Sequence, residues 1–186
     1  TGLAIVGVSE KVQYEIKNVS RRSGDTYLGC GYFDFANMIT ANEGGYFPYT
    51  PAATLLRGLR TSVDMLLEEG LDNVFARHTR LAGGVRAAVD AWGLKNCAQS
   101  PDIFSDTVTA IIVGDGYDAN SVIQTAYKKY GVSLGAGLSK VAGKVFRIGH
   151  LGALSEAQAL SGLAIIEMAM LDHGYPISSG SGVAAA

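Results

Sequence analysis

The chain has 186 residues, of which 48% are hydrophobic and 17% are charged, and its formal net charge is −2. This length and composition allow one packed domain, or one domain with a small appendage, and exclude an intrinsically disordered chain. Acidic and basic residues are mixed along the sequence without a basic block, which argues against a nucleic-acid-binding surface.

The cysteines and the apolar run at residues 2–8 indicate where in the cell the protein is located. Cys30 and Cys97 are far apart and lack the spacing of a metal site, a usage typical of reduced thiols in the cytoplasm. The three histidines form no ligand cluster either, so we expect no metal. The apolar run at residues 2–8 is too short to cross a membrane and follows no basic region. We therefore expect a cytoplasmic protein without membrane contact.

The first part of the chain predicts one strand and two short helices. Residues 2–8 are apolar without interruption, which indicates a strand buried on both faces. A helix is expected over residues 9–18, and a polar, glycine-containing loop over residues 20–31. The aromatic-rich residues 32–38 are expected to be partly helical, and Glu43-Gly44-Gly45 should end that element.

A longer helix is predicted to begin at Thr50 and Pro51, because threonine is a good N-cap and proline is favoured at the first helical position. Gly70 should end it. Its apolar residues form one stripe at helical spacing: Ala52, Leu55, Leu56, Leu59, Val63, Leu66 and Leu67. A helix start presents unpaired N–H groups that can hold a phosphate, although most helix starts hold nothing.

A second long helix is expected to be capped by a residue of 72–73 and to end near residues 92–93. Its apolar stripe consists of Val74, His78, Leu81, Val85, Val89 and Trp92. We expect His78 to be a packed, hydrogen-bonded core histidine rather than a catalyst, since the sequence provides it with no partner. The neighbouring Arg77 and Arg80 are expected to be ordinary surface charges.

The following segment predicts a small sheet. The β-branched run at 107–113 indicates a strand, residues 118–130 a short helix, and residues 132–134 a short strand. Residues 135–140 superficially resemble a phosphate loop. They lack the spacing of the common phosphate motifs, so we expect a plain turn.

A long helix should follow the last strand. Ser155 and Gln158 have the spacing of a capping box, and the helix that they open is expected to run through Met170. Because this helix is apolar on almost all sides, we expect it to be covered on several sides. The tail at residues 178–186 consists of small residues and is expected to be flexible.

The last predicted strand, at residues 144–148, carries a single arginine. The alternation places Phe146 and Ile148 on one face and Arg147 on the other, among apolar and glycine neighbours. Burying an unpaired guanidinium is costly, and its planar fork suits a carboxylate or a phosphate. Two interpretations stay open: a structural ion pair with one of the 17 acidic residues, or a ligand-binding arginine.

Several motifs together resemble one enzyme family. Residues 144–152 read KVFRIGHLG, residues 47–51 read FPYTP and are followed by LLRGLR at 55–60, and residues 66–78 read LLEEGLDNVFARH. In this order and spacing the motifs resemble class V aminotransferases, in particular the serine–glyoxylate and alanine–glyoxylate group. The resemblance covers nearly the whole chain, and the combination is more specific than any one motif.

The resemblance implies an α/β fold, with a small sheet covered by helices. The chain would be the C-terminal small domain and the end of the large domain of a fold type I transferase that depends on pyridoxal 5'-phosphate. Residues 1–30 would be the tail end of the large cofactor-binding domain, and residues 31–72 a connecting and interface segment with the long helix. Residues 73–186 would form the C-terminal small domain.

The resemblance also implies transfer of an amino group from serine or alanine to glyoxylate or a similar small 2-oxo acid. The lysine that forms the Schiff base with pyridoxal phosphate, and the aspartate that binds the pyridinium nitrogen, would lie upstream of Thr1. No residue of this chain is therefore expected to be catalytic, and Lys11 does not match the lysine. The chain alone is expected to be inactive.

Two residues match binding positions of the family, and a third would substitute for a residue that this chain lacks. Arg147 matches the arginine that binds the substrate carboxylate, and Thr50 matches a threonine that contacts the cofactor phosphate of the other subunit. Some relatives have a tyrosine where this chain has Phe47, and Tyr49 would take its place. The expected partner is a second copy in a homodimer, or a companion chain that supplies the N-terminal part.

Two hypotheses from other functional classes stay open. The chain could be a non-catalytic dimerisation or binding module, because apolar faces meant for a missing half would favour association. It could also be an N-terminal-threonine hydrolase, in which the amine of Thr1 activates its own hydroxyl. Thr1 leads directly into an expected buried strand, which argues against the hydrolase.

Overall fold

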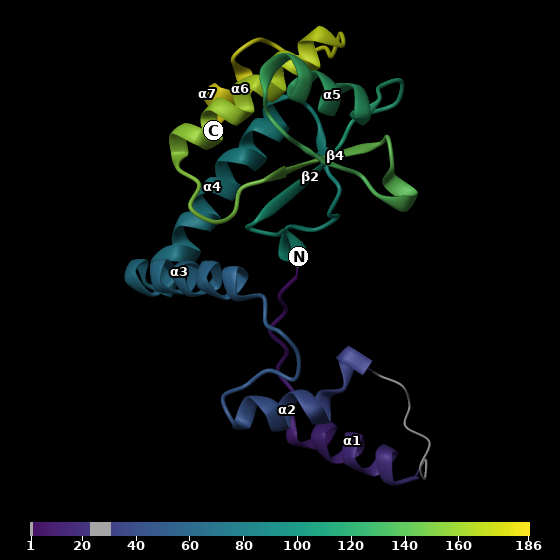
Figure 1. Ribbon diagram of the computed structural model, residues 1–186. Coiled ribbons are helices and arrows are strands. Elements are labelled where there is room, and N and C mark those ends of the chain that lie inside the picture. Colours follow the sequence, from purple (N-terminus) through teal and green to yellow (C-terminus); the bar gives the residue numbers. More distant parts are fainter. Residues whose placement is uncertain (1, 23–30) are drawn as a thin grey trace. The chain divides into compact units, whose positions relative to one another are not determined.

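The computed structural model describes residues 2–22 and 31–186. The chain divides into two compact units, Thr1–Glu68 and Glu69–Ala186 (Figure 1). Each unit is described by itself.

Helices dominate the first unit. Its elements are α1 (Glu10–Arg22), the 3₁₀ turn η1 (Gly31–Phe33), α2 (Phe35–Glu43) and α3 (Ala53–Glu69), whose last residue belongs to the second unit. The Ser9 hydroxyl accepts a hydrogen bond from the Val12 N–H (3.4 Å), and Asp34 caps α2 by accepting from the Asn37 N–H (3.1 Å). These caps agree with the two short helices predicted from the sequence.

The strand predicted over residues 2–8 is wrong. These residues form no strand, and Ile5 and Val6 are exposed. A strand needs a neighbour for its backbone groups, and all strands among the described residues belong to one sheet of the second unit. Of the loop predicted over residues 20–31, residues 20–22 belong to α1, and residues 23–30 lie outside the described residues.

The start of α3 also differs from the prediction. The Ala53 N–H donates to the Pro51 carbonyl (2.9 Å) in a tight turn, and the helical ladder begins with the Leu56 N–H donating to the Ala52 carbonyl (3.0 Å). The helix therefore begins at Ala53, and Thr50 precedes it without capping it. None of the α3 residues is buried in this chain.

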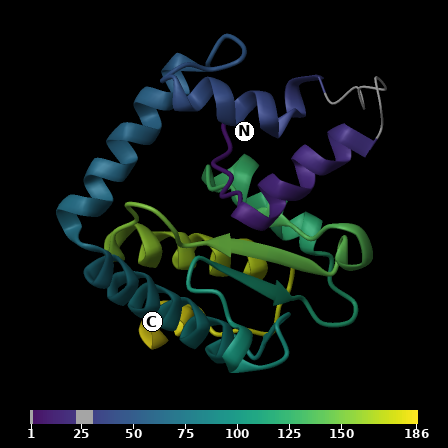
Figure 2. The ribbon, with the colours of Figure 1, turned by 90° about the horizontal axis from the view of Figure 1, so that it is seen from below.

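The second unit contains a four-stranded antiparallel sheet in the order β1-β2-β4-β3. The strands are β1 (Lys95–Asn96), β2 (Val108–Ile112), β3 (Gly135–Ala136) and β4 (Val145–Gly149). Figure 2 shows β2 and β4 side by side. Their antiparallel register places Ala110 opposite Arg147. The strand predicted at residues 132–134 lies instead at 135–136, where its backbone pairs with β4.

Helices cover one face of this sheet (Figure 1). They are α4 (Leu71–Ala91), α5 (Ala119–Tyr130) and α6 (Glu156–Asp172); short turns η2 (Pro101–Ile103) and η3 (Ser139–Val141) lie in the connections. The core joins their apolar residues to Ile111, Phe146 and Ile148 of the sheet. This layer of helices against a small sheet confirms the predicted α/β fold.

The predicted stripe of α4 is confirmed, because Val74, His78, Leu81, Val85, Val89 and Trp92 are all buried. The predicted cap is wrong. Gly70 precedes the helix with a φ of 82° and no side chain caps the first turn. Only glycine adopts this backbone conformation without strain.

The start of α6 agrees with the prediction, but the expectation that several sides of the helix are covered does not hold in this chain. Ser155 and Gln158 form the predicted capping box. Leu163, Ile166 and Met170 are buried, whereas the side of α6 that carries Leu160, Met168 and Leu171 is exposed in this chain.

The C-terminal tail is ordered by a buried carboxylate. Residues Ser181–Ala185 form α7, where a flexible tail was predicted. Glu167 of α6 accepts hydrogen bonds from the backbone N–H groups of Gly180 and Gly182, and from the indole N–H of Trp92 (2.8 Å). The small residues of the tail suit this close approach to α4 and α6.

Candidate substrate-carboxylate site

Arg147 lies in the middle of β4 on the face of the sheet that the helices leave open. Its neighbours Phe146 and Ile148 point into the core, so the alternation of the strand directs Arg147 to the opposite side, where it is exposed. Arg147 is exposed in this chain because helices cover only one face of the sheet.

The surface around Arg147 is apolar. Val108 and Ile112 of β2 flank its partner Ala110 on the same face and are each more than a third exposed. The Nε–H of Arg147 donates to the Ala136 carbonyl (3.1 Å), and within the described residues its guanidinium makes no ion pair. The structural ion pair considered above is thus not found in this part of the chain, and the terminal nitrogens can receive a ligand anion.

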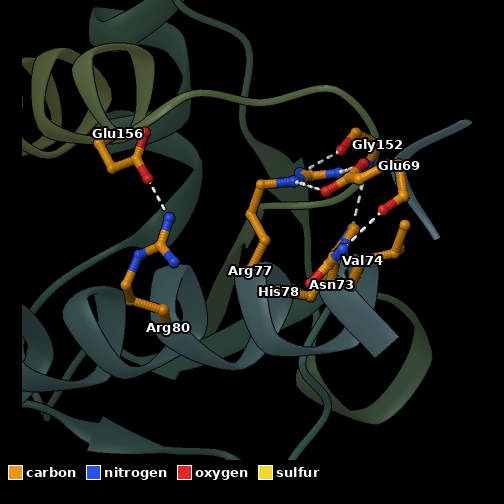
Figure 3. A network of polar contacts seen from close by, with 8 residues as sticks. All are labelled: Glu69, Asn73, Val74, Arg77, His78, Arg80, Gly152 and Glu156. Atoms are coloured by element: carbon orange, nitrogen blue, oxygen red, sulfur yellow. Dashed lines mark hydrogen bonds and ion pairs between the residues drawn. The ribbon is translucent and has the colours of Figure 1, made fainter. Parts of the chain in front are cut away.

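A network of polar contacts holds the loop after β4 (Figure 3). His78 and Arg77 of α4 form hydrogen bonds with both backbone groups of Gly152. The Gly152 N–H donates to His78 Nε2 (3.1 Å), and the Gly152 carbonyl accepts from Arg77 Nη1 (2.8 Å). His78 Nδ1 lies 2.7 Å from the Val74 carbonyl. Because Nε2 accepts, Nδ1 carries the proton and donates to that carbonyl. The prediction of a hydrogen-bonded core histidine is confirmed.

Arg77 is not the ordinary surface charge that was predicted. Its guanidinium forms a bidentate pair with Glu69 (2.6 and 2.8 Å), and only 19% of its side chain is exposed. The hydrogen bond from Arg77 lowers the pKa of the Glu69 carboxyl below its ordinary value. Arg80, by contrast, pairs with Glu156 at the exposed surface, as predicted.

This network fixes the loop that leaves the strand of Arg147. Sequence reasoning missed it because the contacts join residues far apart in the chain, and Gly152 takes part only through its backbone. The single available signal was the position of Arg77 next to a histidine of the buried stripe.

The two residues predicted to bind a cofactor phosphate lie in the first unit. Thr50 and Tyr49 are both exposed in the turn before α3, and the Tyr49 ring lies 5.2 Å from that of Tyr32. Two hydroxyl donors beside the start of a long helix have the chemistry that a phosphate needs. The structure thus places Thr50 and Tyr49 in one unit and Arg147 in the other.

A cavity of about 410 Å³ lies in the second unit, but Arg147 does not line it. Its walls come mainly from α6, from Ile148 and Gly149, and from residues 132–134. His150 is also in the wall, and its nitrogens lie near the Thr109 hydroxyl (2.9 Å) and the Asp106 carbonyl (3.1 Å). Burial lowers the pKa of His150, so both ring nitrogens serve the fold in the neutral form.

Residues 2–22 and 31–186 contain no group of three or more histidine, cysteine, aspartate or glutamate side chains that could hold a metal ion. No helix in the same ranges is both long and apolar enough to cross a membrane.

Known proteins resemble the chain along its whole length. It is 55% identical over 186 residues to the serine–glyoxylate aminotransferase of Hyphomicrobium methylovorum, covering all of this chain and 45% of that protein. It is 52% identical over 185 residues to the L-aspartate–glyoxylate aminotransferase of Paracoccus denitrificans, again covering 45% of the relative. No protein-family model matches the chain. The chain spans about half the length of the curated relatives it matches.

The fold agrees with these similarities. The crystal structure of the ureidoglycine–glyoxylate aminotransferase of Bacillus subtilis superposes with a TM-score of 0.80 at 28% sequence identity, covering 95% of this chain and 45% of that structure.

Proposed function

We propose that this chain, which has the sequence and fold of the C-terminal part of a class V, fold type I aminotransferase, works as that part of a complete enzyme. The enzyme would transfer an amino group from serine or alanine to glyoxylate or a similar small 2-oxo acid. Residues 1–30 would complete the large domain, residues 31–72 would connect the domains, and residues 73–186 would form the small domain.

The observation that carries this proposal is the guanidinium of Arg147, which lies on an apolar sheet face and makes no ion pair with any described residue. Amino acids and 2-oxo acids share a carboxylate, and a planar guanidinium can bind one with two parallel hydrogen bonds. Arg147 would orient the substrate without taking part in proton transfer.

The cofactor of this chemistry would be pyridoxal 5'-phosphate, which acts as an electron sink when bound. Thr50 and Tyr49 would donate hydrogen bonds to its phosphate, and the start of α3 adds a favourable partial charge. The lysine that binds the cofactor would lie upstream of this chain. This chain would therefore contribute binding and orientation only.

We infer a partner from the exposed apolar surface of the first unit. Tyr46, Phe47 and Tyr49 are each about half exposed or more, and Leu67 of α3 is 66% exposed. Surfaces of this kind mark protein contacts. The partner would be a second copy in a homodimer, or a companion chain with the N-terminal part.

Replacement of Arg147 by alanine in the full-length protein tests the proposal. The KM for glyoxylate should rise roughly 10–100-fold, since hydrogen bonds to charged groups contribute about 1.5–3 kcal/mol. Turnover should also slow. Arg80→Ala is the matched control, because that arginine has only an exposed ion pair, and its kinetics should stay unchanged. Unchanged kinetics of Arg147→Ala would show that Arg147 is only structural.

The donor and the location of the lysine need separate assays. Serine, alanine and aspartate should be compared as donors to glyoxylate, since the two relatives above differ in their named donor. The 186-residue chain alone should show no transamination. Turnover by this chain alone would contradict the proposal that the lysine lies upstream.

The exposed stripe of α3 also favours the second candidate, a non-catalytic binding module. A full-length protein that forms a stable dimer but binds no pyridoxal phosphate would support that candidate over the enzyme. Thr1, on which the hydrolase alternative rests, lies outside the described residues, and a threonine-directed covalent inhibitor followed by mass spectrometry tests it. The cytoplasmic location stays a prediction.

A further inference from the structure

The short strand β3 lies directly against the side chain of Arg147. Gly135 pairs with Arg147 and Ala136 with Phe146 in the antiparallel register. The Nε–H of Arg147 donates to the Ala136 carbonyl (3.1 Å), so the stem of the arginine crosses β3 at Gly135.

Gly135 provides the space for this crossing. A Cβ atom at this residue would lie 3.0 Å from Nε, 3.1 Å from Cβ and 3.5 Å from Cζ of Arg147. The first two distances are shorter than ordinary van der Waals contacts, and all three atoms belong to the same arginine. Gly135 is not among the glycines with positive φ, so its backbone conformation does not require glycine. The need for glycine comes from the arginine.

The nearby Gly137 has a different role. A Cβ atom there would collide with the backbone carbonyl of Val141 and would lie 2.9 Å from that of Val145. The Gly137 N–H donates to the Val145 carbonyl (2.8 Å), which extends the pairing of the backbone beyond β3. Gly137 therefore serves the turn itself, because the three atoms nearest to a Cβ there belong to the backbone of Val141 and Val145.

We propose that Gly135 is a positioning residue for Arg147, and that Gly135 and the Ala136 carbonyl together set the direction of the guanidinium. This inference rests on the proposed carboxylate-binding role of Arg147. With Nε engaged, the guanidinium offers the edge formed by Nη1 and Nη2, which matches one carboxylate with two hydrogen bonds. A long side chain held in one orientation loses less freedom when it binds a ligand.

Gly135→Ala in the full-length enzyme should disturb carboxylate binding. The KM for glyoxylate should rise about tenfold, with a smaller change in kcat, because the substitution weakens an interaction made in both ground and transition states. Gly83→Ala is the matched control: a Cβ atom on Gly83 of α4 would meet no atom within 4 Å, so KM should not change. An unchanged KM in Gly135→Ala, with a raised KM in Arg147→Ala, would overturn the inference and leave the proposed function standing.

A double substitution separates positioning from general damage to the fold. Because the nearest atoms to a new Cβ are all from Arg147, the double variant Gly135→Ala/Arg147→Ala should have the KM and the thermal stability of Arg147→Ala alone. The same pair keeps the test valid if Gly135→Ala fails to fold, since removing the arginine should then restore folding. An added loss in the double variant would contradict the inference.

A measurement without turnover tests the geometry itself. In protein labelled with ¹⁵N-arginine, the Nε–H signal absent from Arg147→Ala identifies Arg147. It should exchange slowly with solvent in the wild type and at least several-fold faster in Gly135→Ala, because the bond to Ala136 weakens. Equal exchange rates would refute the positioning role. If Arg147→Ala leaves KM unchanged while these rates differ, the proposed function fails but the geometric part of the inference stands.

Discussion

Helices α3 and α4 carry equally clear apolar stripes, but only the stripe of α4 is buried in this chain. All six residues of the α4 stripe, from Val74 to Trp92, are buried, whereas no residue of α3 is. The stripe of α4 lies against α6 and the sheet, and no described residue buries the stripe of α3 in this way. A stripe in a sequence thus shows that a helix has a face to bury, but not whether the same chain covers it.

The largest expected effect compares one leucine in each helix. Leu81→Ala in α4 should lower the free energy of unfolding of the full-length protein by about 2–5 kcal/mol, because the side chain leaves a cavity in a packed core. Leu67→Ala in α3, where the leucine is 66% exposed in this chain, should cost less than about 0.5 kcal/mol of protomer stability. Chemical denaturation measures both.

The variant Leu67→Ala also tests whether a partner covers α3. If a partner covers this helix, Leu67→Ala should weaken association, and the effect should depend on protein concentration in analytical ultracentrifugation. A large loss of stability in Leu67→Ala that does not depend on concentration would mean that the same chain covers α3 after all.

The next largest effect on stability is expected at Glu167, whose carboxylate accepts a hydrogen bond from Trp92 at the end of α4. Burial raises the pKa of the Glu167 carboxyl, but hydrogen bonds from Trp92, Gly182, Gly180 and Ser181 outweigh it and bring the pKa below 4.5. An amide at this position cannot accept from all these donors. Glu167→Gln should therefore cost about 1–3 kcal/mol in the free energy of unfolding.

The matched control for this substitution lies on α3. Glu68 is exposed there, and Glu68→Gln should change the free energy of unfolding by less than about 0.5 kcal/mol. Equal stability of the two variants would show that the tail is not anchored by Glu167.

A smaller effect depends on pH. Burial lowers the pKa of His150 from its ordinary value of 6.5, so the unfolded chain takes up a proton at a higher pH than the folded one. Stability should therefore be retained above pH 6.5 and fall below it, by at most about 1.4 kcal/mol per pH unit. Thermal melts between pH 7.5 and 5.5 measure this slope.

Substitution of two histidines shows which group causes the decline in stability below pH 6.5. His150→Asn should lower stability at neutral pH and flatten the decline, because the titrating group is gone. His173→Gln should leave the decline in place, since the imidazole of His173 is bonded to Thr125 at the exposed surface. A decline that persists in His150→Asn would assign it to another group.

The smallest expected effect is a substitution that leaves the free energy of unfolding unchanged or raises it. The Tyr175 hydroxyl is buried without a hydrogen-bond partner among the described residues, and burial raises its pKa to about 12. Tyr175→Phe should leave stability unchanged or raise it by up to about 1 kcal/mol, because an unpaired buried polar group is unfavourable. Tyr117→Phe, which loses a hydrogen bond to the Gly174 carbonyl (3.2 Å), is the comparison in a denaturant titration. A loss in Tyr175→Phe larger than in Tyr117→Phe would reveal a partner for that hydroxyl.

Local patterns allowed much of the second unit to be predicted. The capping box of Ser155 and Gln158, the stripe of α4 and the strand at β2 all depend on residues close together in the chain, and all were found. The start of α3 was missed because Ala53 bonds back to Pro51, a turn that competes with capping by Thr50. The strand expected at residues 2–8 was missed because a strand also depends on a neighbour.

Residue identity and spacing are enough to specify the family resemblance, the helix stripes and the position of Arg147 within a strand. The three-dimensional arrangement was needed to show that Arg147 faces the open side of the sheet, that Gly135 makes room for it, and that Arg77 and His78 hold Gly152. Those relations join residues distant in the chain, and they depend on the register of the strands and on which face the helices cover, which local spacing does not specify.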